Sequence, residues 1–277
     1  MTAQPRVLAN EIVARLREGE GSATAGRGKW RLDRRAVADR LHRLLDEPGL
    51  ISQGRLNLCG PALLFKVWLE RDPVACVTFA STLFEQGHAR IGDLPVRPSR
   101  GLLEHEYGRP GRRPTNCPAA DWMLMASVRD ANNRIFPYRY ERGIREAVAA
   151  MTLPGALRRW LSATGVYASV RDDTNLVLAR GVAHARKLAP DPDRDVFLLV
   201  ASEMFAGPGA LPVRARRFVV SLLPNHWIAL TSRVVEPGSR TVAFRFWSWG
   251  ADQPPVLLDR RAFRRCYYGA VIADARA

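Results

Sequence analysis

Three residues of this 277-residue chain have the types and spacing that nucleophilic catalysis requires: Gln53, Cys59 and His226. Cys59 lies where a loop is expected to turn into a helix, and the free backbone N–H groups at a helix N-terminus stabilise a thiolate. Gln53 stands six residues earlier in QGRLNLCG, where its amide and the Cys59 N–H could both donate to a developing oxyanion. Gly60 is expected to leave room for a substrate carbonyl. Together these groups predict attack of a thiolate on a carbonyl carbon.

His226 is the candidate general base. It begins an expected strand, HWIALTS, directly after the turn LLPN, and a general base needs such a rigid mounting. The other histidines lie in polar helical or loop contexts and are expected at the surface: His42, His88, His105 and His184.

The three other cysteines are weaker candidates for the nucleophile. Cys76 and Cys266 lie inside apolar runs and are interpreted as core residues, whereas the role of Cys117, in a proline-rich loop, stays open. The cysteines are far apart and form no CxxC pair, so neither a zinc site nor a disulfide framework is expected. We expect no cofactor and no metal ion.

The order of Gln53, Cys59 and His226 resembles that of the papain-like cysteine peptidases. In that family a glutamine stands six residues before the nucleophilic cysteine, which opens the central helix of a helical lobe. The catalytic histidine follows much later, on a strand of a β lobe. The resemblance implies a papain-like fold, with Cys59 as nucleophile, His226 as base and Gln53 in the oxyanion hole. The CGPA motif with a later HW is also similar to divergent bacterial papain-like toxins and effectors.

The third member of the site stays open. In the family, the strand after the histidine ends in Asn-Ser-Trp-Gly, and the asparagine orients the imidazole. Here the strand ends Trp247-Ser248-Trp249-Gly250, so a tryptophan, which cannot accept the imidazole proton, occupies the asparagine position. Ser248, Asp252 or a backbone carbonyl could take over this role.

The resemblance implies a cysteine peptidase or related thiol-dependent amide hydrolase that acts through a Cys59 thioester, as a secreted bacterial toxin or effector. A deamidase and a transglutaminase would use the same site, and both stay open. The expected partners are a protein or peptide substrate, an immunity protein and a component of a secretion machine. Residues 1–6 continue into an amphipathic segment and not an apolar signal core. We therefore expect synthesis in the bacterial cytoplasm without a cleavable signal peptide, and export by a dedicated secretion system.

The spacing of apolar residues predicts which elements position these groups. Periods of three and four residues predict helices, which cover 7–17, 34–45, a segment that begins near Cys59, 74–86, 118–129 and 152–165. Residues 88–117 are rich in Gly, Pro and Arg and are expected to form a long loop. Apolar runs rich in β-branched and aromatic residues predict strands, which cover 166–172, 195–202, 216–223, 226–235, 241–249 and 266–273, with one helix at 175–188.

This change of pattern predicts an α+β fold with two lobes. We expect an N-terminal helical extension over 1–50, followed by a catalytic domain over 51–277. Within that domain the helical lobe, 51–165, carries Cys59, and the antiparallel β-rich lobe, 166–277, carries His226.

Composition supports a second hypothesis of another class. The chain has 42 Lys and Arg against 27 Asp and Glu, and a net charge of +15 is typical of proteins that bind nucleic acid or another anionic surface. Only three of the basic residues are lysines and the excess is spread along the chain, which indicates a compositional bias toward arginine. A non-catalytic basic binding module therefore stays as an alternative, while the enzyme hypothesis does not call for nucleic acid. No apolar run reaches the length of about 18 residues that spans a membrane.

Overall fold

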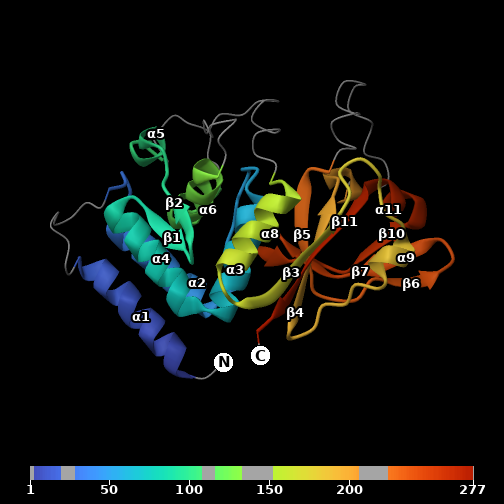
Figure 1. Cartoon of the computed structure of the whole chain (residues 1–277), viewed down its shortest axis with the longest axis horizontal. Helices are drawn as coiled ribbons and strands as arrows, with labels where there is room; N and C mark the ends of the chain where they lie inside the picture. Colours follow the sequence, from blue (N-terminus) through green and yellow to red (C-terminus); the bar gives the residue numbers. More distant parts are fainter. Residues whose placement is uncertain (1–2, 20–28, 108–115, 133–151, 206–223, 277) are drawn as a thin grey trace. The chain divides into compact units, whose positions relative to one another are not determined.

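The computed structural model describes residues 3–19, 29–107, 116–132, 152–205 and 224–276 (Figure 1). The chain divides into two compact units. The first comprises Met1–Thr152 and Ala163–Val166, and the second Leu153–Ser162 and Tyr167–Ala277. Helices dominate the first unit and antiparallel sheets the second, so the expected α+β class is confirmed.

The described part of the first unit is built mainly from five long helices. These are α1 (Ala3–Glu18), α2 (Arg34–Asp46), α3 (Cys59–Arg71) and α6 (Ala119–Ala131), together with α4 (Pro73–Gln86), against which α1 and α3 pack. The shorter elements are η1 (Pro48–Leu50), β1 (Ala89–Ile91), β2 (Leu94–Val96) and α5 (Arg100–Leu103). Helix α3 is buried on almost every side, as its run of apolar residues requires, and it packs against α4 and α6.

Local signals set several helix boundaries where the sequence predicts them. Asp33 accepts a hydrogen bond from the Ala36 N–H at the start of α2, and Asp72 accepts one from the Ala75 N–H at the start of α4. Gly87 ends α4 with a φ of 75°, a left-handed conformation that glycine adopts without a steric penalty.

The prediction of a long loop over residues 88–117 is wrong for residues 89–103. Strands β1 and β2 form a hairpin there, with Ile91 opposite Leu94 and the two residues Gly92 and Asp93 between them. Buried side chains at Ile91 and Val96 hold this hairpin on the unit, and α5 follows it. Three-residue strands are too short to show a clear alternating pattern, which is why the sequence does not predict them.

The described residues of the second unit form two antiparallel sheets. The strands are β3 (Tyr167–Thr174), β4 (Arg194–Val200), β5 (His226–Leu230), β6 (Val235–Gly238), β7 (Thr241–Phe244), β8 (Phe246–Ser248), β9 (Ala251–Asp252), β10 (Val256–Asp259) and β11 (Tyr267–Ala275). The larger sheet has the order β3-β11-β4-β5-β8-β9 and the smaller one β10-β7-β6. Helical segments α8 (Pro154–Ala163), α9 (Val182–Ala185), η2 (Ser202–Phe205) and α11 (Arg260–Cys266) complete the described part.

Three strand and helix predictions for this unit need correction. The expected strand 226–235 is two strands, because β5 ends at Leu230 and β6, in the other sheet, begins at Val235. The expected strand 241–249 likewise divides between β7 and β8, which belong to different sheets. Of the helix expected over 175–188, only α9, residues Val182–Ala185, is present. The strand predicted at 216–223 lies outside the described residues.

Tertiary hydrogen bonds explain why that helix is short. The backbone N–H groups of Asn175 and Arg180 donate to Tyr268 O and Tyr267 O of β11, at 2.7 and 2.6 Å. The Asn175 side chain also accepts from the N–H groups of Val177 and Leu178, which forms a turn in place of a helix.

Among the described helices, none has the length and apolar character that crossing a membrane demands. The division into an extension over 1–50 and a catalytic domain over 51–277 stays a prediction.

Candidate functional site

Cys59 is the first residue of α3, as the sequence predicts. Its side chain is buried, with the residue 7% exposed. Leu58, which precedes it, has no polar side chain to cap the helix, so no capping group competes from that position for the first N–H groups. The position therefore keeps the polarity that favours a thiolate.

Gly60 allows the Thr152 side chain to pack closely against the start of α3. A Cβ at this position would lie 2.6 Å from Cγ2 of Thr152, far inside van der Waals contact. The space beside Gly60 is thus filled by the Thr152 side chain, and the expectation that Gly60 leaves room for a substrate carbonyl is wrong.

Gln53 lies on the loop before α3 and is 5% exposed. Its backbone oxygen accepts the Leu56 N–H at 3.0 Å, and Gly54 follows with a φ of 55°, so the chain turns sharply at this residue. The Oε1 atom of Gln53 is buried without a hydrogen-bond partner among the described residues. An unsatisfied buried amide oxygen costs about 1–3 kcal/mol, so its position calls for an explanation.

The structure distinguishes the other cysteines from a nucleophile. Burial raises the pKa of the Cys76 thiol, and the charge of Asp72 adds to this effect. Burial also raises the pKa of Cys266 and of Cys117, the latter with help from the Asp121 carboxylate. Each of these thiols therefore resists ionisation.

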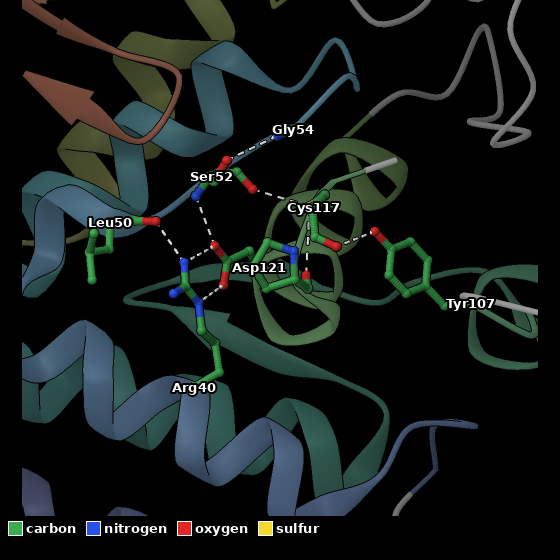
Figure 2. Close-up of polar contacts among 8 residues, drawn as sticks. Arg40, Leu50, Ser52, Gly54, Tyr107, Cys117 and Asp121 are labelled. Carbon is green, nitrogen blue, oxygen red and sulfur yellow. Dashed lines mark hydrogen bonds and ion pairs between the residues drawn. The ribbon is translucent and has the colours of Figure 1, made fainter. Parts of the chain in front are cut away.

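The role of Cys117, left open by the sequence, is structural. Its Sγ donates a hydrogen bond to the backbone oxygen of Ser52 at 3.1 Å, and its own backbone oxygen accepts from the Tyr107 hydroxyl at 2.6 Å (Figure 2). The thiol thus acts as a buried donor that ties two loops of the first unit together.

His226 is the first residue of β5, opposite Val200 of β4, and it is buried with 6% exposure. Its Nε2 lies 2.8 Å from the Ser248 hydroxyl oxygen. Burial lowers the pKa of the imidazole to about 4, so the ring is neutral at physiological pH. The other histidines differ, because His42 and His88 are exposed and His105 and His184 are half-buried.

Of the candidates for the third member, Ser248 is the one that meets the imidazole. In the β8–β9 hairpin Trp247 pairs with Asp252 and Ser248 with Ala251. Successive side chains of a strand point to opposite faces, so Asp252 and Trp247 share the face that Ser248 does not. Asp252 is exposed, whereas Ser248 is buried beside His226.

Trp249 covers the imidazole at the cost of backbone strain. Its ring stacks on His226 with centroids 4.6 Å apart and planes 13° apart. Trp249 and Gly250 form the two-residue turn between β8 and β9, with φ values of 54° and 82°. A turn of this kind favours Asn-Gly, and a bulky residue at positive φ is unusual and costs about 1–3 kcal/mol.

A second histidine cluster was not predicted from the sequence. His184 Nδ1 lies 2.7 Å from the Tyr267 hydroxyl, and its Nε2 lies 2.6 Å from Asp173 Oδ2. Burial raises the pKa of Tyr267, so its hydroxyl stays protonated. These residues come from α9, β11 and β3, and no local pattern connects them.

Sequence-predicted residues therefore divide between the two units. Gln53 and Cys59 belong to the first, at two points of one segment, and His226 and Ser248 are joined in the second. In the described ranges no group of three or more His, Cys, Asp or Glu is placed to hold a metal ion. Comparisons with protein-family models, curated proteins and solved structures found no match for the chain.

Proposed function

We propose that the protein is a papain-like thiol-dependent amide hydrolase, in which Cys59 is the nucleophile, His226 the general base and Gln53 an oxyanion donor. The proposal depends on one observation, which is that Ser248 and Trp249 hold the imidazole of His226 in place. The imidazole is held in place by the contact of Nε2 with Ser248 and by the ring of Trp249, and it is neutral, so a ring nitrogen can accept a proton as a general base does.

The proposed reaction requires one tautomer of His226, and the contact with Ser248 accommodates it. With Nε2–H donating to the Ser248 oxygen, Nδ1 carries the lone pair and takes the proton. In this proposal Ser248 takes the orienting role that an asparagine has in the papain-like peptidases. A serine hydroxyl also donates, so it fixes the tautomer less strictly than a carbonyl oxygen does.

The proposed reaction has two acyl-transfer steps. His226 Nδ1 accepts the proton of Cys59, and the thiolate attacks the carbonyl carbon of an amide. The oxyanion forms hydrogen bonds with the Cys59 N–H and the Gln53 amide. When the intermediate collapses, the C–N bond breaks and His226 protonates the departing amine, which leaves an acyl thioester on Cys59.

The acceptor in the second step decides the product. Water releases a carboxylic acid, which is peptide hydrolysis when a peptide bond was cleaved and deamidation when a side-chain amide lost ammonia. An amine would give a crosslink. Analysis of the products by mass spectrometry therefore separates the three activities.

Delivery as a toxin or effector is part of the same proposal. Expression of the wild type beside Cys59→Ala, in a bacterial and in a eukaryotic host, should inhibit growth in one host for the wild type alone. Equal growth of wild type and variant in both hosts would remove the toxin part of the proposal.

Iodoacetamide labelling at mildly acidic pH tests the nucleophile directly. Peptide mapping should show Cys59 alkylated well before Cys76, Cys117 and Cys266, whose thiols burial keeps protonated. His226→Ala should slow the labelling of Cys59 about tenfold or more, because the base that forms the thiolate is lost.

Two controls complete the labelling experiment. Cys266→Ser should leave the rate at Cys59 unchanged. His184→Ala removes a histidine from the same unit as His226, and it should also leave that rate unchanged. Equal slow labelling of all four cysteines in the wild type would refute the assignment of Cys59 as nucleophile.

A further inference from the structure

A buried ion pair lies next to the segment that carries Gln53, and the mechanism above leaves it unused. Arg40 of α2 and Asp121 of α6 form two parallel hydrogen bonds, Nε to Oδ1 at 2.8 Å and Nη2 to Oδ2 at 2.7 Å. Asp121 is fully buried, and the Arg40 side chain is 12% exposed. Figure 2 shows both side chains with their partners.

Each member of the pair also binds the backbone just before Gln53. Arg40 Nη2 donates to the Leu50 oxygen at 2.6 Å, and the Ser52 N–H donates to Asp121 Oδ2 at 2.8 Å. These are charge-assisted hydrogen bonds, which are about twice as strong as neutral ones. The pair therefore fixes two points of the chain within three residues of Gln53.

The next peptide group is fixed from a different direction. Cys117 Sγ donates to the Ser52 oxygen at 3.1 Å, and that carbonyl belongs to the peptide bond that enters Gln53. The Ser52 hydroxyl oxygen in turn accepts the Gly54 N–H at 3.2 Å. The backbone that leads into and out of Gln53 is thus held on both sides (Figure 2).

The ion pair itself is a weak source of stability. Burial raises the pKa of Asp121 in spite of its bonds to Arg40 and Ser52, because the surroundings disfavour the charged carboxylate. A buried ion pair is in general no more stabilising than apolar side chains of the same volume. A pair of apolar side chains could not form the hydrogen bonds to the Leu50 oxygen and the Ser52 N–H.

We propose that Arg40 and Asp121 are positioning residues, which hold the loop so that the Gln53 amide points at the oxyanion of the reacting acyl group. The inference rests on the proposed function. Neither side chain touches a reacting atom, and both act through the backbone of residues 50–53. A loop that moves by about 1 Å can lower a rate by about a hundredfold, so such bonds matter for catalysis.

Two reagents of different chemistry isolate the role of Gln53. Cys59 thiolate attacks the carbonyl of p-nitrophenyl acetate, the ester C–O bond breaks, and p-nitrophenolate leaves an acetyl thioester. This acylation passes through an oxyanion. Iodoacetamide instead reacts by displacement of iodide at a saturated carbon, which develops no oxyanion. The ratio of the acylation rate to the alkylation rate at Cys59 therefore measures oxyanion stabilisation alone.

The expected results follow from the proposed positioning. Gln53→Ala should lower the ratio about a hundredfold, as loss of one oxyanion donor does. Asp121→Asn keeps the shape but removes the charge, and it should lower the ratio about tenfold. In the Gln53→Ala background Asp121→Asn should have no further effect, because the group that it positions is gone.

A matched control and a milder variant accompany this comparison. Glu85→Gln breaks the ion pair between Arg34 and Glu85, which is also largely buried in the first unit, and it should leave the ratio unchanged. If Asp121→Asn does not fold, Arg40→Lys serves in the same cycle. A lysine keeps the charge but cannot hold Asp121 with two bonds and Leu50 with a third.

The outcomes separate the inference from the function on which it rests. A wild type whose Cys59 is not acylated at all refutes the proposed function, and the inference with it. An active wild type in which Asp121→Asn has the same effect with and without Gln53, or in which Glu85→Gln lowers the ratio equally, refutes the inference alone.

Discussion

The buried imidazole of His226 makes the stability of the protein depend on pH in a defined range. Its pKa is lowered from about 6.5 in an unfolded chain to about 4 in the folded protein, because burial disfavours the charged ring. Between these two pH values the unfolded chain carries a proton on His226 that the folded protein does not. The free energy of unfolding therefore falls as the pH decreases from 6.5 to 4, by about 1.4 kcal/mol per pH unit and about 3 kcal/mol in all.

The variant His226→Gln isolates this contribution. Glutamine stays neutral and can still hydrogen-bond with Ser248, so the variant lacks the proton linkage but retains a polar partner for the hydroxyl. Urea denaturation of both proteins at several pH values gives the two slopes. Other carboxylates and histidines titrate in both proteins alike, so the difference between the slopes belongs to His226.

Nuclear magnetic resonance provides a check that does not depend on a two-state unfolding transition. The ring protons of His226 should keep the shifts of a neutral imidazole down to a pH of about 4. Titration of this ring near 6.5, or equal pH slopes for wild type and His226→Gln, would refute the claim that the imidazole is held neutral by burial.

Three further substitutions test the packing around the site. Trp249→Asn should raise the pKa of His226 toward 6.5, as followed by ring-proton titration. It should change the unfolding free energy by less than about 1 kcal/mol, since the lost stacking is offset by relief of the positive φ. Gly60→Ala should cost about 1–3 kcal/mol in urea denaturation through collision with Thr152, and most of that cost should disappear in the Thr152→Gly background. Tyr267→Phe, which removes the hydroxyl bonded to the histidine of α9, should cost about 1–2 kcal/mol in the same assay while leaving the labelling of the nucleophile unchanged.

Features with local causes could be predicted from the sequence. Helix α4 begins after Asp72 and ends at Gly87 as expected, because a capping carboxylate and a glycine at positive φ act within one turn of the helix. The start of α3 at Cys59 follows in the same way from its position after a loop and before an apolar run. These boundaries depend on neighbours in the chain alone.

Features with distant causes could not be predicted. The helix expected at 175–188 is replaced by a turn, because Asn175 and Arg180 bond to β11, which lies more than eighty residues later in the chain. The contact of Asp121 with the Ser52 N–H joins residues 69 positions apart. Ser248 was one of several candidates, and only the register of β8 against β9 decides between it and Asp252.

Some departures of the structure from local preferences lie at, or next to, residues that the sequence pattern singles out. Trp249 adopts a backbone conformation that suits asparagine or glycine, and it does so where its ring covers His226. Gln53 keeps a buried amide oxygen without a partner, and Asp121 keeps a buried charge beside the same loop. Each departure costs free energy of folding, and each would be relieved by a common substitution. Proteins often retain such costs at functional sites, and the proposed mechanism would give those at Gln53 and His226 a role.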